Sequence, residues 1–133
     1  MSSPDLLRGG CLCGAVSYEV EDVFAYAHNC HRSWCRRATG GAIEPFGGIE
    51  RERRLTSGEG GLLILGGPAA GHDLRCGTCG SLLASVVRGG RWVHVTYGTL
   101  HEAPTLRPTA HVMVGSKGPW FEVTDDLPRR EAF

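Results

Sequence analysis

Two short cysteine turns, Cys11-Leu12-Cys13-Gly14 and Cys76-Gly77-Thr78-Cys79-Gly80, decide the fold of this chain. In each turn a glycine follows the second cysteine, so the backbone is free to take a positive φ and direct its amides toward the sulfurs. Two such turns supply the four thiolates of a tetrahedral zinc site, which leaves no position for water or substrate. A structural zinc there would close a long loop between the N-terminus and the middle of the chain. The predicted ligands are Cys11, Cys13, Cys76 and Cys79.

Length and charge restrict the class of protein. With 133 residues the chain suits one domain, residues 1–133, since either half alone would bury too little apolar surface. The formal net charge is zero, so we expect no nucleic-acid or membrane partner. The N-terminal stretch has no apolar signal region, and no later run approaches the length of a membrane span, so we expect a cytoplasmic protein. In that reducing compartment the 6 cysteines favour metal ligation over disulfides.

The pattern of apolar residues predicts a mainly β protein of short strands. The 20 glycines and 7 prolines fit strands joined by tight turns. The clearest hairpin joins strands over 81–87 and 91–97 through Arg88-Gly89-Gly90. One short helix is predicted over 33–39, with Ser33 as N-cap and Gly40 as its end. Further predicted strands cover 15–20, 24–28 paired with it, 42–46, 49–57, 62–65 and 110–114, and 66–71 is a predicted loop.

A third group, Cys30-His31-Arg32-Ser33-Trp34-Cys35, carries the functional question. Two thiolates with His28 and His31 nearby resemble an incomplete, open metal site, but Arg32 places a permanent cation where a third close ligand is expected. Alternatively, Arg32 with Arg36 or Arg37 lowers the pKa of Cys30 or Cys35, which gives a reactive thiolate or a reversible disulfide. The third interpretation is two partly buried, unreactive thiols. The sequence leaves all three open.

The three cysteine groups belong to a longer ordered set of motifs. The first is Gly9-Gly10-Cys11-Leu12-Cys13-Gly14-Ala15-Val16, and the second is Cys30-His31-x-Ser33-x-Cys35-Arg36-Arg37-Ala38-Thr39-Gly40. Then follow Cys76-Gly77-Thr78-Cys79-Gly80-Ser81, Tyr97-Gly98-Thr99-Leu100, Pro108-Thr109-Ala110-His111-Val112, Trp120 and Asp126-Leu127-Pro128. From Gly9 to about Phe133 the chain resembles the glutathione-dependent formaldehyde-activating enzyme (Gfa) family, also called the centromere protein V/Gfa domain.

The resemblance implies a fold, a metal and an activity. The implied fold is an Mss4-like β-tent of short antiparallel strands, organised around a structural zinc on the four outer cysteines. The implied activity is that of a carbon–sulfur lyase, which joins the glutathione thiol to an aldehyde or cleaves the adduct. Relatives perform it at a second zinc held by Cys-x-Cys-x-x-Cys, where this chain has Cys30, Arg32 and Cys35. His101 also stands where relatives commonly carry an acidic residue.

Two functions therefore stay open. The first is a Gfa-like lyase acting on a small-molecule thiol adduct of an aldehyde, such as one of glutathione. In it Cys30 and Cys35 line a degenerate second metal site, and Arg32 meets a substrate carboxylate. The alternative is a non-catalytic zinc-stabilised module that keeps the pocket to bind a small anion or a protein. The predicted cofactor is one structural zinc. A second zinc would favour the enzyme, while a single zinc leaves both functions open and requires an activity assay.

Overall fold

The computed structural model describes residues 4–67 and 71–133, which form two β-sheets and one short α-helix. The smaller sheet has the strand order β1-β2-β5, and the larger has the order β10-β3-β4-β9-β8-β7-β6. The strands are β1 (Leu6–Gly10), β2 (Ser17–Glu21), β3 (Tyr26–Cys30), β4 (Glu44–Glu50), β5 (Arg54–Ser57), β6 (Leu62–Gly67), β7 (Gly71–Cys76), β8 (Leu82–Val87), β9 (Trp92–Thr96) and β10 (His111–Val112); the helix is α1 (Ser33–Thr39).

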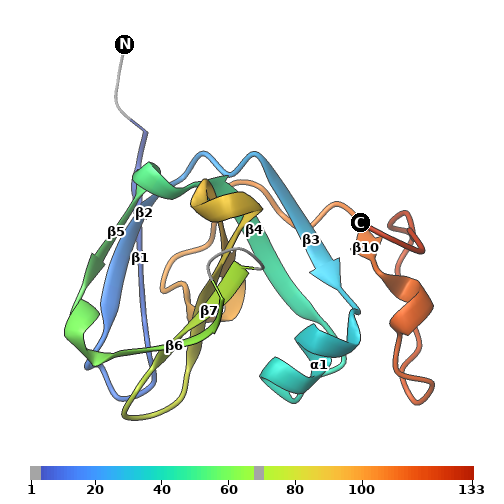
Figure 1. Ribbon diagram of the computed structural model, residues 1–133. Coiled ribbons are helices and arrows are strands. Elements are labelled where there is room, and N and C mark those ends of the chain that lie inside the picture. The colour runs from blue at the N-terminus through green and yellow to red at the C-terminus, as the bar shows by residue number, and fades with distance from the viewer. Residues whose placement is uncertain (1–3, 68–70) are drawn as a thin grey trace.

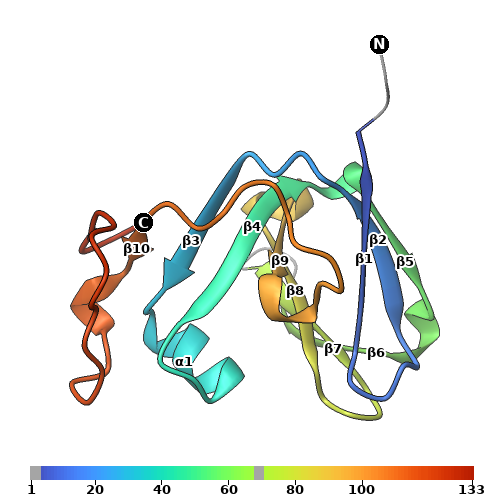
Figure 2. The same ribbon diagram turned by 180° about the vertical axis from the view of Figure 1, so that it is seen from behind.

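The two sheets lean on each other like the sides of a tent (Figure 1). The chain crosses between them at the top of this view, where β2 leads to β3 and β4 leads through a 3-10 turn, Arg51–Arg53, to β5. Figure 2 shows the reverse side, with β1, β2 and β5 in one sheet and β8 and β9 beside β4 in the other. All strand pairs are antiparallel except β10 with β3, where His111 lies opposite Asn29. The prediction of a mainly β, tent-like fold is confirmed.

The space between the sheets holds the main hydrophobic core. It contains buried apolar residues from β1 and β2 of the smaller sheet and from β4, β7, β8 and β9 of the larger sheet, and Cys11 and Cys76 of the outer cysteine turns belong to it. Burial at alternate positions of β1 and β2 gives each strand one core face, as period-two patterning requires. A second, smaller cluster around Phe46 contains Cys30, with Cys35 packed against it. The two cysteine groups therefore lie in different parts of the core.

Two adjacent glycines of β4 carry aromatic rings on opposite faces of the strand. A Cβ at Gly47 would lie 2.6 Å from the Phe24 and Tyr97 rings, and a Cβ at Gly48 would overlap the Tyr26 ring. The missing side chains let these rings lie directly on the backbone, which is a common reason for glycine inside a strand. One of these rings, Tyr26, lies near the pocket described below.

Several predicted elements are confirmed by the structure. The hairpin over β8 and β9 is present, and Gly89 and Gly90 at its turn both have positive φ. The helix covers Ser33–Thr39 as predicted and ends at Gly40, whose left-handed conformation lets its amide bond to the Arg36 carbonyl. Strand β6 contains the predicted 62–65 run. Of the predicted loop 66–71, Gly66, Gly67 and Gly71 are strand residues, and 68–70 lie outside the described residues.

Four details of the prediction were wrong. Strand β3 does not pair with β2; it pairs with β4 and β10, because the chain crosses to the larger sheet after Glu21. The predicted strands 42–46 and 49–57 are divided differently, since β4 runs unbroken through Glu44–Glu50 and a 3-10 turn separates it from β5. Ser33 is the first helical residue, and the N-cap is Arg32, which makes no side-chain capping bond. Only His111–Val112 of the predicted strand 110–114 pair.

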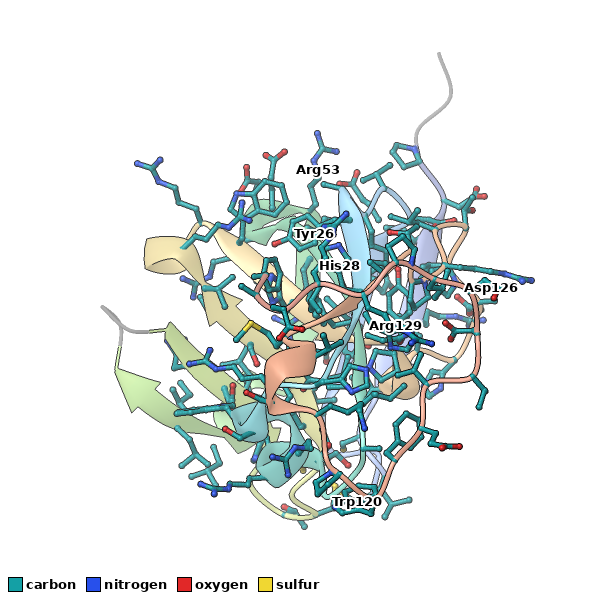
Figure 3. All side chains as sticks on the ribbon, turned by 90° about the vertical axis from the view of Figure 1, so that its right-hand side faces the viewer. Tyr26, His28, Arg53, Trp120, Asp126 and Arg129 are labelled. Atoms are coloured by element: carbon teal, nitrogen blue, oxygen red, sulfur yellow. The ribbon has the colours of Figure 1, made fainter. Side chains whose placement is uncertain are left out.

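The C-terminal segment folds back along β10, the edge strand of the larger sheet next to β3. Two backbone hydrogen bonds hold the returning chain. The His111 amide donates to the Pro128 carbonyl, and the Arg130 amide donates to the His111 carbonyl. In Figure 3, which views this side, Tyr26 and His28 lie near each other at β3, and Trp120 lies at the far end of the C-terminal excursion. The segment thereby brings the chain's last aromatic residue, Phe133, beside Phe46 and His94 of the larger sheet.

Candidate functional site

The two outer cysteine turns meet at one place in the fold. Strand β1 leads directly into the first turn, and β7 ends at Cys76 and leads into the second. A backbone hydrogen bond closes each turn. The Gly14 amide donates to the Cys11 carbonyl, and the Gly80 amide donates to the Cys76 carbonyl. Gly14 and Gly80 have φ of 82° and 80°, as expected from a glycine after the second cysteine. The turns thus present their thiols to each other.

The four sulfurs have the spacing of a tetrahedral metal site. Their Sγ atoms all lie within 4.8 Å of one another. The Cys11–Cys13 and Cys13–Cys76 distances are 3.6 and 3.7 Å. Tetrahedral zinc with Zn–S bonds of about 2.3 Å requires sulfurs about 3.8 Å apart, so the donor set fits such an ion. The backbone amide of Val16 donates to Cys11 Sγ, as orienting bonds to thiolate ligands do.

Ser81 joins the two turns beside the sulfurs. Its hydroxyl accepts a bond from the Leu12 amide at 3.0 Å and lies 3.2 Å from Cys79 Sγ. Hydrogen bonds from Ser81, first from its side chain and then from its backbone, lower the pKa of Cys79 to about 5. A thiol with this pKa is a thiolate at neutral pH, the form that binds a metal.

The inner cysteines line a separate pocket of about 530 Å³ on the larger sheet. Cys30 ends β3, and Cys35 lies in the first turn of α1. The Cys35 thiol donates to Cys30 Sγ at 3.1 Å, so the two sulfurs are in direct contact. This hydrogen bond is the largest cause of the lowered pKa of Cys30, and it raises the pKa of Cys35. The pair therefore favours a Cys30 thiolate beside a Cys35 thiol.

A buried carboxyl group, Glu44, lies next to this thiol pair. It begins β4 directly opposite Cys30, it also lines the pocket, and it is only 7 % exposed. Burial raises the pKa of Glu44 to about 7, although a hydrogen bond with Cys35 and the charge of Arg75 oppose the rise. At neutral pH this carboxyl is therefore near half ionisation, the state in which a group both accepts and returns protons.

A second carboxyl, Asp73, and two cations complete the polar lining. The Asp73 carboxylate accepts hydrogen bonds from Ser85 Oγ at 2.6 Å and from Trp34 Nε1 at 3.3 Å. These bonds hold the carboxylate and the indole ring in place relative to each other. Arg32 and Arg88 are exposed residues that line the same pocket. The Arg88 guanidinium lies over the Tyr26 and Trp92 rings, 5.4 Å from each centroid. The pocket thus combines buried acids with exposed cations.

Aromatic side chains form the apolar wall. His94 stacks on Phe46 with centroids 4.2 Å apart, and Phe133 stacks parallel to His94 at 5.8 Å. His94 Nε2 lies 2.6 Å from Tyr26 Oη. Burial, then the charge of Arg88, lowers the pKa of His94 to about 4, so this imidazole is neutral at physiological pH. A neutral, stacked wall of this kind suits the apolar part of a small molecule.

The structure places the predicted site residues as follows. Cys30, Cys35 and Arg32 do come together at one pocket. Among residues 4–67 and 71–133, however, only the outer cysteines form a group of three or more metal-ligating side chains close enough to share an ion. Arg32 stands where a third thiol would be, so the residues present do not fit a second zinc.

The histidines near the inner cysteines were a misleading signal. His31 is fully buried and turns to His111, with Nε2 of His31 2.8 Å from Nδ1 of His111, and His111 in turn contacts Asp125 at 2.9 Å. His28 stacks on Tyr26, and neither His28 nor His31 lines the pocket. The sequence analysis missed Glu44, Asp73, His94 and Phe133. The β pairing brings Glu44, Asp73 and His94 to the inner cysteines and the returning C-terminal segment brings Phe133, so no local motif indicates them.

Fold and site together define a small β-protein with four clustered thiols that could bind a metal ion and a separate pocket lined by two further thiols. The model of the family described as glutathione-dependent formaldehyde-activating enzyme matches residues 6–116. The chain belongs to this family. A crystal structure of a Rhodobacter sphaeroides protein is similar at 26% identity and a TM-score of 0.60, over 74% of this chain and 91% of that one. The chain has no match among the curated proteins.

In the described part of the chain, no helix has the length and apolar character needed to cross a membrane.

Proposed function

We propose that this chain is a carbon–sulfur lyase that joins a small-molecule thiol to an aldehyde, or cleaves the adduct, in the pocket of Cys30 and Cys35. Family membership supports a glutathione-related enzyme. The observation that carries the proposal is the position of Glu44, a buried carboxyl with a pKa of about 7 at a pocket that also presents two cations. Its volume of about 530 Å³ lies within the usual range for small-molecule sites.

One structural zinc held by Cys11, Cys13, Cys76 and Cys79 is part of the proposal. When bound, zinc would supply folding free energy and would have no free coordination position for chemistry. The proposed reaction uses no second metal, since Arg32 replaces the third thiol. We also propose a cytoplasmic location, because the four thiols need a reducing compartment to stay free for the metal.

The reaction follows from proton transfer at Glu44. In the forward direction the carboxylate takes the proton of the bound thiol, and the sulfur attacks the carbonyl carbon of the aldehyde. A carbon–sulfur bond forms, the carbonyl π pair moves onto oxygen, and Glu44 returns the proton to that oxygen. Cleavage is the same sequence reversed. A positioned acid–base group of this kind contributes about 10²- to 10⁴-fold in rate.

Arg32 and Arg88 would bind and orient the substrate. Both guanidinium groups carry a permanent charge, and both residues line the pocket that holds Glu44. Glutathione has two carboxylates, which two such cations suit. Cys30 and Cys35 line the reacting end of the pocket beside Glu44.

The test is the rate of exchange between glutathione and formaldehyde, followed by exchange NMR with the zinc-loaded, reduced protein. We expect exchange above the spontaneous rate and a loss of about 10²-fold in Glu44→Gln. The exposed Glu52→Gln is the matched control and should keep the wild-type rate. Exchange that never exceeds the spontaneous rate, with the adduct still bound, would instead support the non-catalytic binding module.

A further inference from the structure

Cys30 and Cys35 form a contact pair with no metal to hold. Their sulfurs are 3.1 Å apart, while a disulfide bond is about 2.05 Å long, so a shift of about 1 Å would join them. Cys35 lies in the first turn of a helix with no buried residues, and Cys30 is fixed at the end of a strand. The helical partner can therefore supply the movement while the strand stays in the sheet.

The two thiols have different roles because their surroundings differ. Cys30 accepts the Cys35 hydrogen bond, which lowers its pKa most, and the Arg32 backbone and charge lower it further. Burial and the charge of Glu44 raise this pKa, but the net shift is downward. Cys30 is only 4 % exposed but lines the pocket, so a molecule reaches it from that side. Cys30 is accordingly the sulfur that attacks first, and Cys35 is the sulfur that then attacks the mixed disulfide.

Glu44 gives the proton of Cys35 a destination. Glu44 lies opposite Cys30 in the sheet and lines the same pocket as Cys35. The charged groups that act on Glu44 are Asp73 and Arg75, of opposite sign. Cys35 loses its hydrogen-bond acceptor once Cys30 has reacted, and the remaining partner for its proton is this carboxyl.

The geometry points to a second activity at this pocket, thiol–disulfide exchange with low-molecular-weight disulfides through a Cys30–Cys35 couple. The Cys30 thiolate attacks one sulfur of the small disulfide, which forms a mixed disulfide and releases one small thiolate. Cys35 then gives its proton to Glu44 and attacks Cys30 Sγ, which forms the Cys30–Cys35 disulfide and releases the second thiolate. The small disulfide is reduced by two electrons and the protein pair is oxidised by two. A small thiol reverses both steps.

This activity goes beyond the proposed lyase and does not depend on it. It needs no aldehyde, and the co-reactant is a disulfide of a small thiol. The exposed Arg32 and Arg88 favour anionic disulfides, for which a carboxylate-bearing peptide disulfide is the natural probe.

The test uses the full-length, zinc-loaded protein equilibrated with mixtures of reduced and oxidised glutathione. Mass spectrometry of the alkylated protein and of its peptides then reports which cysteines are oxidised. We expect a single two-electron transition in which the chain loses two hydrogens and Cys30 is linked to Cys35. A wild-type chain that keeps both thiols reduced in pure oxidised glutathione would overturn the proposal.

Two variants distinguish the steps. Cys35→Ser should stop after the first step and hold one glutathionyl group on Cys30. Glu44→Gln should slow the second step by about 10²-fold and accumulate the same mixed disulfide, while Glu52→Gln behaves as wild type. The assigned order predicts that Cys35 in the Cys30→Ser variant is glutathionylated more slowly than Cys30 in the Cys35→Ser variant. Equal rates of glutathionylation in the two variants would contradict this order. Lyase exchange is measured separately in reduced protein, so either activity can fail alone.

Discussion

Single residues at the pocket carry most of its chemistry, and Glu44 is the one whose environment is most unusual. It is almost completely buried, yet it lies among the acid Asp73, the cation Arg75 and the thiol Cys35. Burial raises its pKa from 4.5 to about 7, so the folded chain binds this proton more readily than the unfolded chain does. Stability is therefore greatest below the unfolded pKa and falls as the pH rises through about 7.

Glu44→Gln should remove that loss of stability, because glutamine does not ionise. The gain in unfolding free energy over wild type should be about 1 kcal/mol larger near pH 8.5 than near pH 6. Urea denaturation at the two pH values, in buffers that contain zinc, measures it. The exposed Glu52→Gln should show no such dependence on pH. Equal gains for Glu44→Gln at both pH values would mean that the pKa of Glu44 is not raised in the folded chain.

At the same scale, Gly48 of β4 shows why strand propensity alone is a poor guide. A methyl group there would overlap the Tyr26 ring, so Gly48→Ala should destabilise the fold by about 1–3 kcal/mol in spite of the better strand propensity of alanine. Thermal or urea unfolding measures the change. Gly98→Ala is the control, since its Cβ would meet nothing within 4 Å. Equal effects of the two substitutions would mean that Tyr26 does not rest on β4.

At the scale of elements, the metal turn and the pocket helix are tied to each other. Arg75 of β7 donates to the Gly80 carbonyl in the second cysteine turn and to the Ala38 carbonyl in α1. Its charge also acts on Glu44. One side chain therefore connects the four-thiol site with the helix that carries Cys35, so a metal bound there would have an indirect part in shaping the pocket.

The C-terminal segment covers part of the pocket with Phe133, which is half exposed and lies parallel to the His94 ring. Phe133→Ala should open this side and raise the rate at which Cys30 is alkylated several-fold, while stability changes little. Timed alkylation followed by peptide mass spectrometry measures the rate. Trp120→Ala, at an exposed aromatic residue of the same segment that does not line the pocket, is the control. An unchanged rate would mean that access to Cys30 does not pass Phe133.

Elements with strong local signals were predictable from the sequence. The hairpin at Arg88-Gly89-Gly90 and the helix ending at Gly40 depend on nearby residues, and the structure has both. The pairing of β3 with β4 and β10 was not predictable, because it depends on where the chain crosses between sheets. For the same reason Glu44 and Asp73, which lie far apart in the sequence, gave no sign of sharing a pocket with Cys30. The four outer cysteines were the exception, since their spacing alone indicates a common ion.

At the scale of the whole molecule, the four outer thiols hold together segments that are distant in the sequence. Cys11 and Cys76 lie in the main core, so a metal bound there would stabilise the contact between the two sheets. Cys76→Ser should release the zinc and unfold the protein, because the binding free energy of a structural zinc is largely folding free energy. Circular dichroism and metal analysis of the purified variant measure this. A folded variant that keeps a full equivalent of metal would contradict the assignment.

The most direct test of the account is the number of zinc ions per folded chain after incubation with excess zinc and removal of unbound metal. We expect one equivalent, held by Cys11, Cys13, Cys76 and Cys79, with Cys30 and Cys35 still open to alkylation. Two equivalents, with Cys30 and Cys35 protected, would contradict it. The pocket would then be a metal centre in spite of Arg32, and neither the metal-free lyase step nor the disulfide couple would stand.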